Sequence, residues 1–300
     1  MRTSERILLA GAAAVSLALR AVAFFRYRFD SDEPQHLHVA WGWTAGLVQY
    51  RDYFDNHAPL FHLLTAPLLK ALGERADILL WMRAPMLILF AAVLYATYVI
   101  GRAMYDERTA LWGVVLLSLF PPFFLKSLEY RTDNLWNTLW MLALLALMRR
   151  RYSLAGLLLG AALGVSLKTT LLLATLGIAA LIATHGRGKR NWQMLVPFAI
   201  GFAIIPALLL AFFALMHAWD AMVYCVFTFN ANVSQTRGYV HLGRYLYPFA
   251  LAGVIFAAWR FRAMENRARY FAAVATGIFI VTLGGFWILI SPRDFLPIMP

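Results

Sequence analysis

Residues 194–216 read MLVPFAIGFAIIPALLLAFFALM, a run in which no residue carries a charge. An α-helix needs about 20 apolar residues to cross the roughly 30 Å of hydrocarbon in a bilayer. This run would be apolar on every side of a helix, whereas a surface helix of a soluble domain is apolar along one stripe. The stretch therefore predicts a transmembrane helix whose backbone is satisfied internally in lipid.

Further apolar blocks predict further spans at residues 7–25, 84–104, 110–125, 135–148, 154–167, 170–184, 245–259 and 270–290. The 300 residues are 62% hydrophobic and only 14% charged, whereas a soluble domain carries about 25% charged residues. Pro121 and Pro122 are expected to end or kink the third span. We expect an all-α polytopic membrane protein with about nine transmembrane helices, forming a single domain over residues 1–300.

The remaining composition excludes other classes. The single cysteine, Cys225, rules out a disulfide within the chain. The net charge of +12 does not indicate nucleic-acid binding, because the basic residues lie in short clusters between apolar blocks. The basic start Met1–Arg6 is followed by no small-residue cleavage site, so the first block is interpreted as a retained anchor.

The loops predict an orientation. Basic residues gather on one side of the alternating spans, at Arg2, Arg6, Arg108, Arg149, Arg150, Arg151, Arg187, Lys189, Arg190, Arg260, Arg262, Arg267 and Arg269. By the positive-inside rule that side is the cytoplasm. The opposite side receives residues 26–83, 126–134, 217–244 and 291–300, which hold most of the acidic residues and every histidine except His185. We therefore expect an inner (plasma) membrane protein whose chemistry faces the periplasm or exterior.

The first outer loop, residues 26–83, is rich in aromatic and aliphatic residues. Pro34 suits the first turn of a helix, with the Asp32-Glu33 pair at its N-terminus. We expect two helices parallel to the membrane surface, near residues 34–46 and 59–71, with their aromatic side chains at the headgroup level.

Short motifs at matching membrane positions carry a family resemblance. They are Ser31-Asp32-Glu33-Pro34, Asp55-Asn56-His57-Ala58-Pro59-Leu60, Arg131-Thr132-Asp133, Leu167-Lys168-Thr169 and Arg293-Asp294-Phe295-Leu296-Pro297. Together they resemble the C-type (GT-C) membrane glycosyltransferases, in particular the bacterial group related to protein O-mannosyltransferases and aminoarabinose transferases. Members of that family usually continue with more spans, so the chain is expected to be either a family core or a truncated form.

The resemblance implies an inverting hexosyl- or pentosyltransferase. Its donor would be a sugar on a polyprenyl phosphate in the membrane, and its acceptor a glycan, a lipid or a protein. The implied site residues are Asp32, Glu33 and Asp133 for catalysis, Lys168, Arg131 and Arg293 for the donor phosphate, and His57, Asp55 and His36 as acceptor-binding or supporting groups. The carboxylates of Asp32 and Asp133 would suit Mg²⁺ or Mn²⁺, although some relatives work without a metal.

Simpler interpretations remain open. Asp32 and Glu33 could only cap a surface helix, and Lys168 could only extend to the membrane interface. A polytopic transporter or a flippase for lipid-linked sugars is the alternative function, and it would need facing charges inside the spans and broken helices. A scaffold or assembly subunit ranks third, because it would not need the clustered outer carboxylates that this sequence has.

Overall fold

The computed structural model describes residues 1–184, 192–236, 242–260, 267–286 and 292–300. Most of these residues lie in helices, and an isolated bridge between Gln49 and Tyr53 is the only strand-like pairing among them. The α-helices are α1 (Thr3–Arg26), α2 (Glu33–Thr44), α3 (Leu60–Leu72), α4 (Ile78–Met82), α5 (Ala84–Met104), α6 (Glu107–Leu119), α7 (Pro121–Lys126), α8 (Thr132–Met148), α9 (Tyr152–Val165), α10 (Thr169–Thr184), α11 (Leu195–Leu215), α12 (Trp219–Val223), α13 (Phe229–Thr236), α14 (Leu242–Arg260) and α15 (Arg267–Phe286). Short helices of other types are η1 (Trp192–Met194), η2 (Tyr224–Thr228) and η3 (Pro292–Ile298).

Within the described residues, three helical segments are long and apolar enough to cross a membrane. They are α1, the continuous run of α4 and α5 over Ile78–Met104, and α11. Other apolar helices are shorter: α9 has 14 residues and α10 has 16, which gives lengths of about 21 and 24 Å against a hydrocarbon core of about 30 Å. The chain is therefore an all-helical membrane protein with three candidate spans, and helix length alone does not establish nine crossings.

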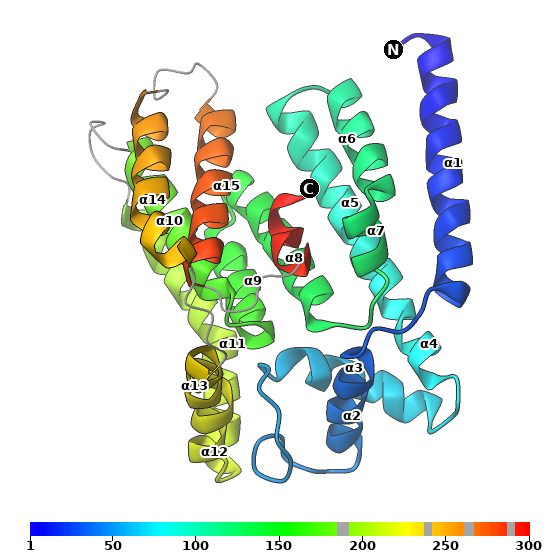
Figure 1. The fold of residues 1–300 in the computed structure, drawn as a ribbon, viewed down its shortest axis with the longest axis vertical. Coiled ribbons are helices and arrows are strands. Elements are labelled where there is room, and N and C mark those ends of the chain that lie inside the picture. The colour runs from blue at the N-terminus through cyan, green and yellow to red at the C-terminus, as the bar shows by residue number, and fades with distance from the viewer. Residues whose placement is uncertain (185–191, 237–241, 261–266, 287–291) are drawn as a thin grey trace.

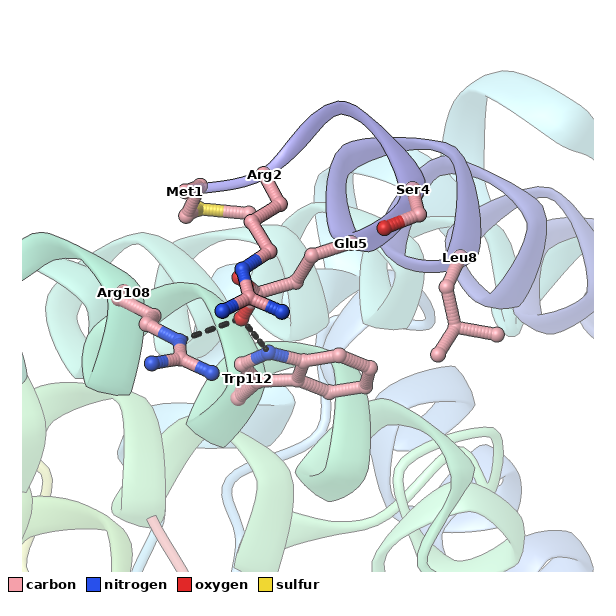
Figure 2. Close-up of a pocket in the computed structure, with 7 residues that line it drawn as sticks. All are labelled: Met1, Arg2, Ser4, Glu5, Leu8, Arg108 and Trp112. Atoms are coloured by element: carbon pink, nitrogen blue, oxygen red, sulfur yellow. Dashed lines mark hydrogen bonds and ion pairs between the residues drawn. The ribbon is translucent and has the colours of Figure 1, made fainter.

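The two ends of the bundle carry different elements. Figure 1 shows α2, α3, α12 and α13 gathered at one end, and the N-terminus of α1 with the turn between α5 and α6 at the other. At this second end Glu5 accepts hydrogen bonds from Arg108 and from Trp112 Nε1 (2.9 Å), beside an open hollow (Figure 2). The start of α1 is thereby held against α6.

The third predicted span is interrupted. The sequence predicts one block over residues 110–125, and the structure divides it into α6 and α7 at Phe120. Phe120 has an extended backbone (φ −66°, ψ 115°), because a residue before proline is disfavoured in the helical conformation, and Pro121 supplies no N–H. The predicted effect of this proline pair is confirmed.

Glycines bring α9 and α11 into close contact. A Cβ atom placed on Gly156, Gly160 or Gly201 would lie only 2.0–2.2 Å from a backbone carbonyl oxygen of the facing helix. Real Cβ atoms do not approach that closely, so the two backbones can meet only where a side chain is absent. Small residues at such positions are typical of helix pairs in membranes, where close packing replaces the hydrophobic effect as the cause of association.

The first outer loop contains the two expected helices. The predicted ranges 34–46 and 59–71 correspond to α2 and α3, which pack against each other. Pro34 lies in the first turn of α2, as predicted, and Gly46 adopts a positive φ of 77° just after the helix, a conformation that glycine enters without steric cost. How α2 and α3 lie relative to the membrane surface stays a prediction.

Candidate functional site

An ionic network lies at the end of the bundle that carries α2 and α3. At its centre is Arg131, the residue before α8, whose Nη1 donates to Asp30 Oδ1 at 2.8 Å and also to Asp32. Its Nε lies 3.4 Å from Asp133 Oδ2. Burial alone would raise the pKa of Asp30, but the backbone N–H of Asp32 and the charges of Arg293 and Arg131 outweigh burial and lower it. The guanidinium of Arg131 therefore joins three carboxylates.

The turn between α9 and α10 brings Lys168 to the same place. Its Nζ donates to Asp133 Oδ1 at 2.7 Å and to Asp294 Oδ1 at 2.5 Å, and it lies 5.1 Å from the ring centroid of Trp136. The Lys168 side chain is only 12% exposed. Burial lowers the pKa of this amine, but the two carboxylates outweigh burial and raise it. Lys168 is thus a buried cation with two acidic partners.

The segment η3 completes the network from the far end of the sequence. Arg293 donates from Nε to Glu129 Oε2 at 3.0 Å and from Nη2 to Asp30, while Lys126 Nζ donates to Glu129 Oε1 at 2.7 Å. Five carboxylates of the described residues therefore meet four cations: Asp30, Asp32, Glu129, Asp133 and Asp294 with Lys126, Arg131, Lys168 and Arg293. The network is nearly neutral as a whole.

Glu33 has a separate partner, Arg83, between α4 and α5. Both side chains are fully buried, and Arg83 donates from Nε to Glu33 Oε2 at 2.7 Å and from Nη2 to Oε1 at 2.5 Å. The backbone N–H groups of Asp30 and Tyr130 also donate to this carboxylate, each at 2.8 Å. Every oxygen of Glu33 thus has partners within the protein, and the residue joins α2 to the start of α5 and to the segment before α8.

A second polar cluster, which we call the histidine cluster, lies where the loop after α2 meets α3. The fully buried carboxylate of Asp55 accepts from His57 Nδ1 and from Gln49 Nε2, both at 2.8 Å, and lies 3.8 Å from His62 Nδ1. The other ring nitrogen of His62, Nε2, is 2.9 Å from His36 Nδ1. Three imidazoles and one carboxylate therefore form a connected chain of polar groups.

Burial determines the charge of the inner histidines. It lowers the pKa of His62 to about 4, against the opposing effect of Asp55, and lowers the pKa of His36 with a further contribution from His57. Both rings are neutral at pH 7. Acidification from about pH 6.5 towards pH 4 destabilises this region, because the unfolded chain takes up protons that the buried rings do not.

The structure divides the site residues predicted from the sequence between these groups. Five of them meet in the ionic network, which contains Asp32, Arg131, Asp133, Lys168 and Arg293. The others lie outside it: Glu33 pairs with Arg83, and His36, Asp55 and His57 belong to the histidine cluster.

Sequence reasoning gave no site role to Asp30, Arg83, Lys126, Glu129, His62 or Asp294, although Asp294 stands in one of the quoted motifs. Most of these residues stand within three positions of a motif residue in the outer segments, and that proximity was an available signal. Arg83 offered no such signal, because a basic residue directly before an apolar block is typical of an ordinary flanking charge.

The divalent cation predicted for Asp32 and Asp133 stays an untested prediction. Both carboxylates face the guanidinium of Arg131, so a protein cation already lies between them. Within the described ranges, no group of three or more His, Cys, Asp or Glu side chains is placed to hold a metal ion. We therefore propose no function that depends on one.

Asp32→Asn is expected to change stability little. The Asp32 side chain is 41% exposed, and an exposed ion pair contributes about 1 kcal/mol or less. Asp133→Asn should be far more destabilising, because Asp133 is 7% exposed and pairs with both Lys168 and Arg131. Thermal unfolding of the purified variants in detergent checks this. Equal losses of stability in the two variants would contradict the conclusion that Asp32 lies at the exposed edge of the ionic network.

One comparison with known proteins gives a result. A family model described as "GPI transamidase subunit PIG-U" matches residues 39–252, which is most of the chain. The matched range includes Asp55, His57, Arg131, Asp133 and Lys168, and it excludes Asp32, Glu33 and η3. No curated protein and no solved structure matches the chain significantly.

This match corrects the expectations drawn from the resemblance. The placement among C-type glycosyltransferases was wrong, and so were the predicted sugar transfer, the transferase activity, the polyprenyl-phosphate donor and the glycan, lipid or protein acceptor. The match does not indicate the alternative transporter or flippase either. The physical reason is that the motifs are short, and ion pairing at a membrane boundary selects the same residues. Arg131, Lys168 and Arg293, expected on a donor phosphate, are already paired with carboxylates.

Proposed function

The chain belongs to the PIG-U family of GPI transamidase subunits, and we propose that it acts as a membrane subunit of a transamidase complex. Such a complex would join proteins to a glycosylphosphatidylinositol-type lipid. A transamidase transfers an acyl group from one amine to another. The observation that carries the proposal is the family match over residues 39–252.

We assign this chain a supporting role and not the nucleophile. Its single cysteine, Cys225, is buried, and burial raises the pKa of the thiol. A raised pKa disfavours the thiolate, which is the reactive form. The acyl-transfer step would therefore belong to another subunit, and this chain would supply membrane anchoring and a rigid outer surface.

The ionic network and the buried Glu33–Arg83 pair support that role. They join the first outer loop to α8, to the turn before α10 and to η3. Lys126 and Asp32 are the most exposed members, at 20% and 41% of their side chains. We propose that this rim meets the polar part of the lipid or the neighbouring subunit.

We further propose nine crossings, made by α1, α4 with α5, α6 with α7, α8, α9, α10, α11, α14 and α15, with α2 and α3 parallel to the surface. Because successive crossings run in opposite directions, this topology places Arg108 and Arg149–Arg151 at the end of the bundle that holds the N-terminus of α1. The basic loop residues Arg187, Lys189, Arg190 and Arg262 lie outside the described residues. The cytoplasm would lie at this end, and α2 and α3 would face outward.

Cysteine labelling tests the orientation. In a Cys225→Ser background, an impermeant maleimide should label Glu74→Cys in intact cells and Arg151→Cys only after lysis. Both positions are exposed and lie at opposite ends of the bundle. The reverse pattern would contradict the proposed orientation, and labelling of both positions in intact cells would contradict the crossing number between them.

Two measurements on native membranes test the subunit role. Chain isolated in mild detergent should elute as a complex of defined stoichiometry, well beyond its own 33.9 kDa. Membranes supplied with a peptide substrate and hydrazine, a small amine that can accept the acyl group, should form the peptide hydrazide. Deletion of the chain should abolish hydrazide formation. A monomeric chain whose deletion leaves hydrazide formation unchanged would overturn the proposal.

A further inference from the structure

A cavity of about 270 Å³ lies between α5, α8, α10 and α15, with η3 along one side. Apolar side chains form nearly all of its wall, including Met104, Trp140, Met148 and Phe279. The indole Nε1 of Trp140 donates to the carbonyl oxygen of Pro297 at 3.0 Å, which fixes this part of the wall. The polar side chains among the lining residues are Thr175 and Thr276, so the wall suits an apolar occupant better than ordered water, which needs two to four polar partners.

The cavity is somewhat shorter than one membrane leaflet. Trp140 and Met148 both line it and are eight residues apart on α8, which corresponds to about 12 Å along the helix axis. Half of the hydrocarbon core of a bilayer is about 15 Å. The cavity therefore extends from one end of the bundle to about its middle.

Arginines adjoin the lining residues at one end of the cavity. Met148 is followed directly by Arg149, Arg150 and Arg151, all of them exposed. On α15, two residues before the cavity-lining Phe271, the Nε atom of Arg269 donates at 2.9 Å to the carbonyl oxygen of Met104, another lining residue. Apolar walls and a basic rim thus meet at a single end of the bundle.

We propose that this cavity binds one acyl chain of an anionic phospholipid, whose phosphate lies against Arg149–Arg151. The acyl chain supplies the dispersion contacts that an empty cavity between helices would lack. Binding of the acyl chain gains little from the hydrophobic effect, since the lipid tails of the bilayer that it leaves are as apolar as the cavity wall. Selectivity comes from the headgroup, because basic pockets between transmembrane helices attract anionic lipids. The site is independent of the proposed subunit function.

Native mass spectrometry of the purified full chain tests the site. The protein in detergent is given equal amounts of phosphatidylglycerol and phosphatidylcholine with identical acyl chains. We expect at least about a fivefold excess of bound phosphatidylglycerol. Ala275→Trp fills the cavity and should reduce bound phosphatidylglycerol about tenfold. Ala273→Trp is the matched control, because Ala273 lies on the same helix but is exposed and does not line the cavity.

A second variant does not depend on cavity packing. Changing Arg149, Arg150 and Arg151 together to Gln alters only exposed side chains, and it should remove the preference for phosphatidylglycerol while phosphatidylcholine still binds. Arg2→Gln with Arg6→Gln, which removes charge at the same end of the bundle at the start of α1, should keep the preference. Equal binding of the two lipids by the wild type would overturn the proposal. So would full retention of phosphatidylglycerol by a folded Ala275→Trp protein, or an unchanged preference in the triple Gln variant.

Discussion

Arg83→Met is expected to lower the free energy of unfolding by about 3–5 kcal/mol, the usual cost of removing one partner of a buried ion pair. Arg83 and Glu33 are both fully buried, and the guanidinium makes two hydrogen bonds to the carboxylate. Methionine preserves the apolar stem, so the loss reports the unpaired charge on Glu33 together with the hydrogen bonds that Arg83 donates to the carbonyl oxygens of Tyr27 and Arg28. Thermal unfolding in detergent, followed by circular dichroism, measures it.

Two further variants identify the cause. Glu33→Gln combined with Arg83→Met removes both charges and should recover part of the loss, since a neutral pair leaves no unpaired buried charge. Arg75→Met is the matched control: Arg75 pairs with Asp77, but its side chain is 44% exposed, so the change should stay within about 1 kcal/mol. Equal losses of unfolding free energy for Arg83→Met and Arg75→Met would show that the buried ion pair contributes no more to stability than the exposed one.

Gly160→Ala is expected to separate α9 from α11 and to cost about 3 kcal/mol, at the upper end of overpacking effects. The added methyl group would lie 2.2 Å from the carbonyl oxygen of Phe202. A backbone atom cannot rotate away as a side chain can, so the whole helix must shift. The expected result is a lower unfolding temperature and a smaller fraction of monodisperse protein in size-exclusion chromatography.

Gly177→Ala provides the control for this prediction. Gly177 lies inside α10, and a Cβ placed there meets no atom within 4 Å. Alanine favours the helix over glycine by about 1 kcal/mol, so this variant should be as stable as the wild type or slightly more stable. If both glycine variants lost stability equally, the helix backbone and not the contact with α11 would be responsible.

The helices could be predicted from the sequence because apolar run length is a local property. The predicted block 194–216 corresponds to Leu195–Leu215, and the block 84–104 to Ala84–Met104. The break at Phe120 was also predictable, since proline acts on its own neighbours. The contact between α9 and α11 was not, because glycines in an apolar block do not reveal which helix they face.

The site was predictable only in part. Asp32, Asp133 and Lys168 were singled out from the sequence, and the structure places them in one ionic network around Arg131. Their partners could not be identified, because ion pairs such as Arg293 with Asp30 connect residues 263 positions apart. The same lack of partners explains the wrong family: charges that pair with one another were interpreted as charges that bind a substrate.

The sequence separations within the ionic network set an order for its assembly during synthesis, when N-terminal segments are available first. Glu33 needs only the next 50 residues to meet Arg83, so this ion pair of the first outer loop can form early in synthesis. Arg131 reaches Asp30 after 101 residues. Lys168 and Asp30 obtain Asp294 and Arg293 as partners only when η3 is made. Before η3 is made, Glu129 can already pair with Lys126 and Asp30 with Arg131, so η3 adds a second cation, Arg293, to carboxylates that each have one partner.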